Sequence, residues 1–429
     1  MTTLTNVTLD LFLFDIREGL GQSKAEITEN REQFKQKLPN INSAKFDQID
    51  DQYVEPEYQE LLAGRTIDFE FGTSQGYYYP VRLNDIYGLL IECELLQEQS
   101  IDHVMWIENL QKIILSKLNK QTSTMGETWL LSAQMNELSE RYCLEIAQSC
   151  CTILINNNQI KWSPFLDGYL FECWIENQHV IIIFYQHEKN EKRIADLYPY
   201  FMRLLAYHHK IMWAYRQGKN LKQLLKNKAI ETEKYRTELN SYMEQRFNTN
   251  KFQQTLQGTW KILSKYDILL NNLSYQIRTI DTNHRNYDKR LATIEAEFGQ
   301  KITCLSNFSD KTKNKYLFQV QTDYTNLSPE LASLEHMINY IRASVAIEEE
   351  KRERSFQNTI ATWGIGLAAG AIVASISGLF PDDITGWFLY EFFEPKWWKA
   401  MTAIEISCIS AIGAGLITKL VMVVKTKFG

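Results

Sequence analysis

The sequence predicts an α+β cytosolic domain, a long helical, coiled-coil stalk and two C-terminal transmembrane helices. Three patterns along the 429 residues lead to this fold class. Strand-like and helical stretches alternate up to about residue 188, helical periodicity follows, and two long apolar stretches lie near the C-terminus. The formal net charge of −6 argues against nucleic acid as a partner, because phosphate contacts need an excess of Lys and Arg.

Residues 1–188 predict a cytosolic α/β domain. Helical patterns cover His103–Leu118 and Asn136–Ile153, whereas Ser23–Gly64 is polar with only a weak pattern. Six runs rich in β-branched and aromatic residues predict strands: Val7–Phe14, Thr66–Phe71, Tyr77–Leu83, Tyr87–Ile91, Tyr169–Trp174 and Val180–Tyr185. The last two runs flank a short polar segment and predict a hairpin.

Residues 189–328 predict a helical coiled-coil region. One helix is expected from about Glu191 to Arg246, and apolar residues at three- and four-residue steps from Leu256 to Phe298 predict a second. A stalk helix over 329–355 is expected to begin at Ser328-Pro329-Glu330, because serine suits the N-cap and proline the first helical position.

The two apolar stretches predict transmembrane helices at 356–380 and 400–424. No charged residue occurs from Ser355 to Pro381, and a helix needs about 20 residues to cross the hydrocarbon core. The connecting segment 381–399 is acidic, whereas basic residues precede the first stretch and form the tail 425–429. The positive-inside rule therefore predicts that both termini are cytoplasmic, in a multi-pass protein of the cell inner membrane with the lipid bilayer as a partner.

One face of the first predicted span carries small and weakly polar residues. These are Asn358, Thr362, Gly366, Gly370, Val373 and Ser377. They either allow close packing of helices or line a pore at the axis of a ring. In the pore interpretation Gly378, Leu379, Phe380, Asp382 and Asp383 form its mouth, and Glu348 and Arg352 form a cytosolic collar.

Motifs of common enzymes are missing from the sequence. We find no P-loop, no dinucleotide-binding glycine pattern, no H-E-x-x-H and no G-x-S-x-G, so the chain is not expected to be an enzyme. The seven cysteines include no C-x-x-C pair, which indicates reduced thiols and neither disulfides nor a zinc site. His208-His209 has no partner at i+4, so a surface or packing role is favoured over metal binding.

The order of these elements resembles the CorA family of divalent-cation channels. In that family an α/β domain precedes long helices, the last helix continues into the pore-lining span, and a second span ends in a short basic tail such as Lys425-Thr426-Lys427 here. The resemblance implies a homopentamer and a Mg²⁺ cargo. The Gly-Met-Asn motif of the family is replaced by Gly378-Leu379-Phe380, and a phenyl ring cannot supply the amide oxygen of the asparagine.

Two functions remain open from the sequence. One is a homo-oligomeric membrane ion channel gated by its cytosolic domain. The resemblance also extends to divergent CorA-like proteins of type III CRISPR systems, which implies a nucleotide messenger as the gating ligand and a role in antiviral defence. The alternative is a non-conducting, membrane-tethered coiled-coil scaffold. No metal-binding residues and no certain cofactor are predicted.

Overall fold

The structure is a computed structural model that describes residues 4–19, 22–52, 58–95, 103–118, 121–136, 138–243 and 249–349. The chain divides into two compact units. The sheet unit consists of Met1–Lys226 and Ile268–Ser328, and the helical unit consists of Asn227–Asp267 and Pro329–Gly429. The long helices α6, α7 and α9 each contribute residues to both units.

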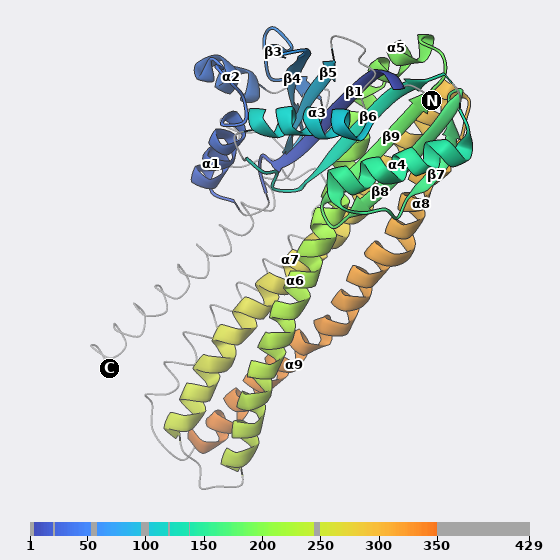
Figure 1. The fold of residues 1–429 in the computed structure, drawn as a ribbon. Coiled ribbons are helices and arrows are strands. Elements are labelled where there is room, and N and C mark those ends of the chain that lie inside the picture. Colours follow the sequence, from blue (N-terminus) through green and yellow to red (C-terminus); the bar gives the residue numbers. More distant parts are fainter. Residues whose placement is uncertain are drawn as a thin grey trace. The chain divides into compact units, whose positions relative to one another are not determined.

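A mixed β-sheet forms the centre of the sheet unit (Figure 1). Its strands are β1 (Leu4–Ile16), β2 (Gln59–Glu60), β3 (Ile67–Phe71), β4 (Ser74–Leu83), β5 (Ile86–Leu95), β6 (Gly126–Met135), β7 (Lys161–Phe165), β8 (Gly168–Ile175) and β9 (Gln178–Tyr185). The strand order is β2-β4-β5-β1-β6-β9-β8-β7, and β3 pairs with β4. All neighbouring strands are antiparallel except β6 and β9, which run parallel.

The described residues also form nine α-helices. They are α1 (Lys24–Lys35), α2 (Ser43–Asp50), α3 (His103–Lys117), α4 (Glu140–Ile155), α5 (Lys189–Asp196), α6 (Tyr198–Met243), α7 (Thr249–Phe298), α8 (Thr303–Lys311) and α9 (Phe318–Glu349). A π-helical segment, Thr312–Leu317, joins α8 to α9.

Both faces of the sheet are buried, and β1 shows why. Side chains alternate between the faces of a strand. Leu9, Leu11 and Leu13 belong to the core that includes residues of α3 and α4. On the opposite face Phe12 packs edge-to-face on Tyr198, and Phe14 stacks on His209, both from α6. Two buried faces explain why β1 reads as a nearly continuous apolar run.

Most predicted strands and the predicted hairpin are confirmed. β8 and β9 pair in antiparallel register from Tyr169↔Phe184 to Ile175↔Gln178. The predicted first long helix is instead two helices, since α5 ends at Asp196 and α6 begins at Tyr198. The helix expected to begin at Pro329 begins at Phe318, so Pro329 lies inside α9, where it supplies no backbone N–H donor.

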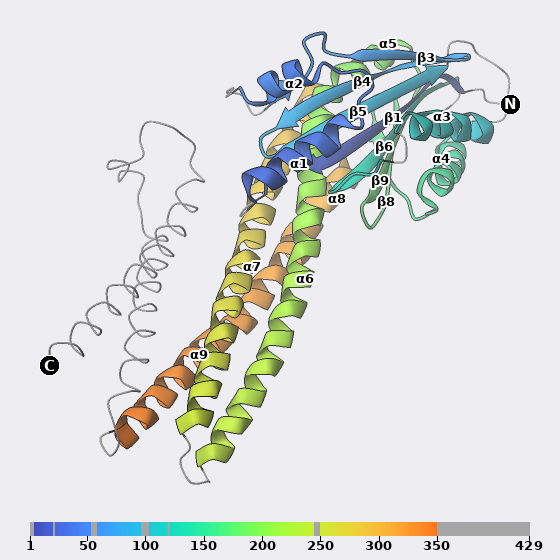
Figure 2. The same cartoon turned by 90° about the vertical axis from the view of Figure 1, so that its left-hand side faces the viewer.

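In the helical unit, segments of α6, α7 and α9 pack side by side (Figure 2). The seam residues Leu334, Ile338, Ile341 and Val345 of α9 are all buried, and so is Leu263 of α7. The Tyr235 ring of α6 approaches the α7 backbone so closely that a Cβ added to Gly258 would lie 2.5 Å from it. Arg236 of this segment also donates to Ser333 Oγ of α9 at 2.9 Å.

The last part of the predicted fold class is wrong for this structure. No helix in the part of the chain that the structure describes is both long and apolar enough to cross a membrane. The helices α6, α7 and α9 have the length, with 46, 50 and 32 residues, but charged side chains recur along all three. The stretches 356–380 and 400–424, on which the prediction was based, lie outside the described residues.

Candidate functional site

The structure does not bring the predicted site residues together. The pore-lining and pore-mouth residues and Arg352 all lie outside the described residues. Glu348 falls in α9, where only the backbone is described. The candidate sites found in the described residues are instead three clusters of polar side chains, all within the sheet unit.

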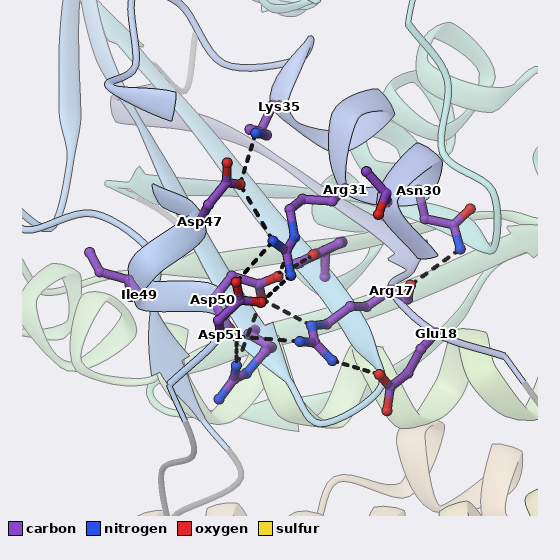
Figure 3. Close-up of polar contacts among 12 residues, drawn as sticks. Arg17, Glu18, Asn30, Arg31, Lys35, Asp47, Ile49, Asp50 and Asp51 are labelled. Atoms are coloured by element: carbon purple, nitrogen blue, oxygen red, sulfur yellow. Dashed lines mark hydrogen bonds and ion pairs between the residues drawn. The ribbon is translucent and has the colours of Figure 1, made fainter. Parts of the chain in front are cut away.

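The first cluster surrounds Asp50, whose side chain is completely buried (Figure 3). Its carboxylate forms ion pairs with Arg17 at 2.9 Å, Arg31 at 2.8 Å and Arg82 at 3.7 Å. The Tyr87 hydroxyl donates to the same carboxylate at 2.7 Å. These partners come from the end of β1, from α1 and from the paired strands β4 and β5, so one carboxylate joins four elements.

The same arginines also satisfy the end of α2. The last carbonyls of a helix lack intrahelical donors, and Asp50 is the last residue of α2. Its backbone oxygen accepts from Arg17 at 3.3 Å and also from Arg82, and the Gln52 oxygen accepts from Arg82 at 2.8 Å. The cluster therefore fixes both the side chain and the backbone at this helix end.

The charge states of the arginines indicate that this cluster has a structural role. Burial lowers the pKa of Arg17, but Asp50, Tyr87 and Glu18 together outweigh that effect and the pKa is raised overall. At Arg82 burial and the like charge of Arg17 prevail, and its pKa is lowered. Every arginine keeps its proton, since guanidinium groups do not deprotonate in proteins. The cluster therefore stabilises the attachment of α1 and α2 to the sheet and offers no group for proton transfer.

The second cluster lies on the opposite face of the sheet and consists of acidic residues. Asp10 of β1 and Glu92 of β5 are directly paired in the antiparallel register. Asp10 is completely buried; its Oδ2 accepts from Tyr198 at 2.7 Å, and its Oδ1 has no hydrogen-bond partner in the described part of the chain. Burial first, and then the charge of Glu92, raise the pKa of Asp10 well above its usual range. Burial raises the pKa of Glu92 to about 7.

The third cluster contains three buried histidines between the sheet and α6. His179 lies 3.2 Å from Glu172 and stacks on His208 with ring centroids 4.5 Å apart. Thr128 Oγ1 lies 2.7 Å from His209 Nε2. Burial, followed by the charge of His179, lowers the pKa of both His208 and His209 well below the usual value. His208 and His209 are therefore neutral rings with a packing role, which the sequence favoured.

The described residues contain no candidate metal cluster, and two of their cysteines have strongly raised pKa values. No group of three or more His, Cys, Asp or Glu side chains in them could hold a metal ion. The six cysteines in this part of the chain are all buried and free of disulfides. Burial raises the pKa of Cys150 and Cys304 to about 12, so these thiols are not reactive thiolates.

Sequence reasoning missed the Asp50 cluster because Ser23–Gly64 is polar and shows only a weak pattern. A signal was available, since Ser23 and Glu26 form a capping box at the start of α1. That motif predicts a helix, and Phe34 is its apolar contact with the sheet, stacked on Tyr87 at 4.5 Å. The pairing of Arg17 and Arg82 with Asp50 depends on tertiary structure and has no local signal.

Comparisons with known proteins identify no family. No family model matches the chain, and no curated protein matches it. Among solved structures, the CorA magnesium transporter from Methanocaldococcus jannaschii is similar over 68% of this chain and 89% of that chain, with 11% sequence identity and a TM-score of 0.21. A score at this level does not establish a shared fold.

Proposed function

We propose that the chain forms a homo-oligomeric, membrane-bound ion channel that its sheet unit gates. The observation that carries this proposal is the continuity of α9. Asp323 of α9 pairs with Lys222 at 2.6 Å within the sheet unit, and Glu330, two turns further along, pairs with Arg236 at 3.3 Å within the helical unit. One unbroken helix therefore connects the sheet unit to the chain that follows Glu349.

The proposed ion path is lined by residues between Asn358 and Asp383. Its support is the composition of the sequence, in which 27 consecutive residues from Ser355 to Pro381 carry no charge. Along this path we propose that Asn358, Thr362 and Ser377 contact water and that Asp382 and Asp383 attract cations at the mouth. The inner membrane, with both termini in the cytoplasm, is the proposed location. The proposal includes no catalytic step.

A narrower form of the proposal is a messenger-gated antiviral effector, supported only by the resemblance in element order. A nucleotide messenger would then act on the sheet unit, and the conducted ions would be poorly discriminated, because Phe380 replaces the motif asparagine. The replacement therefore favours passage of mixed cations over selective transport of Mg²⁺.

One structural observation favours the alternative, a non-conducting scaffold. The α9 seam of Leu334, Ile338 and Ile341 is 0–1% exposed within a single chain. It is therefore already covered without a second copy, and self-association must use other surfaces. The exposed large apolar residues of the described helical unit are Ile230, with 63% of its surface exposed, and Tyr340, with 43% exposed, so these are candidates for such a surface.

Ion flux into liposomes distinguishes the two functions. The purified full chain is reconstituted with Cys408→Ser, and this replacement suffices because the six other cysteines are buried. A water-soluble thiol reagent should block flux through Thr362→Cys and leave the matched control Leu367→Cys conducting. If flux occurs but both variants are unaffected, the ion path lies elsewhere. If no ion passes under any condition, the scaffold replaces the channel.

A further inference from the structure

A small cavity lies in the sheet unit between the β4–β5 turn and helices α6 and α7. Its volume is about 100 Å³, roughly what three water molecules occupy in the liquid. Its lining combines apolar atoms with the polar side chains of Asn84, Asp85, Arg203, Lys210, Asn283 and Asn286. This space is smaller than the sites that enclose drug-sized ligands, but it accommodates a tetrahedral oxyanion.

The charges around this cavity are unbalanced. Lys210 forms ion pairs with both carboxylate oxygens of Asp85, which neutralises that pair. Arg203 has no carboxylate partner among the described residues. Burial and then the like charge of Arg290 lower the pKa of Arg203. The described residues offer neither Arg203 nor Arg290 a carboxylate at ion-pair distance.

One buried hydrogen-bond donor of the Arg203–Arg290 pair is also unused. Arg290 does not itself line the cavity, but its Nε is buried and has no hydrogen-bond partner among the described residues. The Asn286 amide lines the cavity and makes no side-chain hydrogen bond within the described residues. Arg203 uses one donor, Nη1, on the Pro199 carbonyl at 3.0 Å. Buried donors without partners are rare in folded proteins, and each is costly to leave unpaired.

We propose that this cavity binds the oxyanion group of a phosphate-bearing ligand, with Arg203 and Asn286 as its principal donors. Guanidinium groups suit this role because their donors match the geometry of phosphate oxygens. The ligand charge would also supply the counter-charge that Arg203 and Arg290 lack. This inference rests on the messenger-gated form of the proposed function, and its failure is distinguishable because binding can be measured without any ion flux.

The competing explanation is that Arg203 is a packing residue. Its guanidinium carbon lies 4.1 Å from the centroid of the Tyr58 ring, and a cation over an aromatic ring is stabilising by itself. A packing residue predicts that anions do not bind and that its replacement affects stability alone. The two explanations therefore differ in a binding measurement.

The test is calorimetric titration of the detergent-solubilised full chain at fixed ionic strength. Inorganic phosphate and adenosine monophosphate are the two probes. We expect binding of at least one, weakened about tenfold or more by Arg203→Gln, since a charge-assisted hydrogen bond is lost. The matched control Arg193→Gln removes an exposed guanidinium that also lies over a ring, that of Phe298, and should leave binding unchanged.

The two probes separate the sources of the oxyanion. Equal affinity for both indicates a site for the phosphate group alone, and tighter binding of the nucleotide indicates contacts beyond the cavity; either result supports the site. Absence of binding by both probes, or equal binding by wild type and Arg203→Gln, overturns it.

A second variant keeps the test decisive if Arg203→Gln fails to fold. Asn286→Asp places a carboxylate on the cavity wall, where it can serve as the counter-charge of Arg203. The site interpretation predicts that this variant melts at a higher temperature than wild type and loses anion binding. Retention of binding by a well-folded Asn286→Asp protein would contradict the proposal.

Discussion

Two aspartates of the sheet unit are equally buried and have opposite surroundings. Asp50 contacts three arginines and a tyrosine hydroxyl on one face of the sheet. Asp10, on the other face, accepts one hydrogen bond from Tyr198 and is paired across the strands with Glu92. Burial alone thus does not determine what a carboxylate does. Asp50 holds elements together as an anion, whereas Asp10 is favoured in its protonated form.

The largest effect is expected at Asp50. Asp50→Ala leaves three arginines without their shared counter-charge and should lower the free energy of unfolding by about 3–5 kcal/mol, as when one partner of a buried pair is removed. Chemical denaturation of the full chain measures this loss. The control is Asp51→Ala, whose side chain is 64% exposed and pairs with Arg31; it should cost less than about 1 kcal/mol. Equal losses of stability in the two variants would show that the buried Asp50 cluster contributes no more than a surface ion pair.

A substitution in the apolar core of the helical unit can be compared with the destabilisation expected for Asp50→Ala. Ile338 of α9 is 1% exposed, and Ile338→Ala should destabilise by about 2–5 kcal/mol through lost burial and the cavity left behind. The neighbouring Asn339→Ala, on the exposed side of the same helix, should change stability by less than about 0.5 kcal/mol. Similar unfolding curves for both variants would mean that the α9 seam is misassigned.

At the acidic pair the expected effect is a pH dependence. The pKa of Glu92 is raised from 4.5 to about 7, so the folded chain binds this proton more tightly than the unfolded chain does. The contribution of Glu92 to the free energy of unfolding is therefore fully present below pH 4.5 and is lost as the pH rises to about 7. Glu92→Gln should remove a decline of about 2 kcal/mol over that range. An unchanged pH profile would contradict the environment described for Glu92.

The smallest effect is expected at Tyr198. Tyr198→Phe removes the single donor to Asp10 and should cost about 1 kcal/mol. Because the lost hydrogen bond favours the ionised form, the pKa of Asp10 should rise further, and the cost should be greater at pH 8 than at pH 5. Chemical denaturation at the two pH values measures this loss of stability. A larger loss at pH 5 than at pH 8 would contradict the conclusion that the Tyr198 hydrogen bond favours the ionised form of Asp10.

Local sequence patterns predicted the strands and helices whose apolar residues recur at one regular spacing. The strands β1, β8 and β9 and the helices α3 and α7 follow directly from the spacing of their apolar residues. β6 was missed, although Thr128-Trp129-Leu130-Leu131 is apolar and strand-like and a Ser/Thr/Gly-rich stretch precedes it. Pro329 misled the prediction of the α9 start, since a proline at a first helical turn and one inside a helix look alike locally.

The candidate sites were beyond local patterns because their partners are far apart in the sequence. Arg17 and Arg82 are separated from Asp50 by more than 30 residues, and only the register of β4 and β5 places Arg82 opposite Tyr87. Arg203 and Asn286 meet at one cavity only because α6 and α7 pack beside the β4–β5 turn. The residues that sequence reasoning did select for a pore lie outside the described part of the chain.

The mass of the intact particle tests the central claim, that this chain works as a closed self-assembly, most directly. Native mass spectrometry of the detergent-solubilised full chain should give a single homo-oligomer, and the resemblance in element order predicts five copies of the 50.3 kDa chain. Because the α9 seam is covered within one chain, Ile338→Ala should lower stability without changing this copy number. A monomer at the concentrations used for flux would contradict the account, and a dimer would leave the scaffold as its replacement.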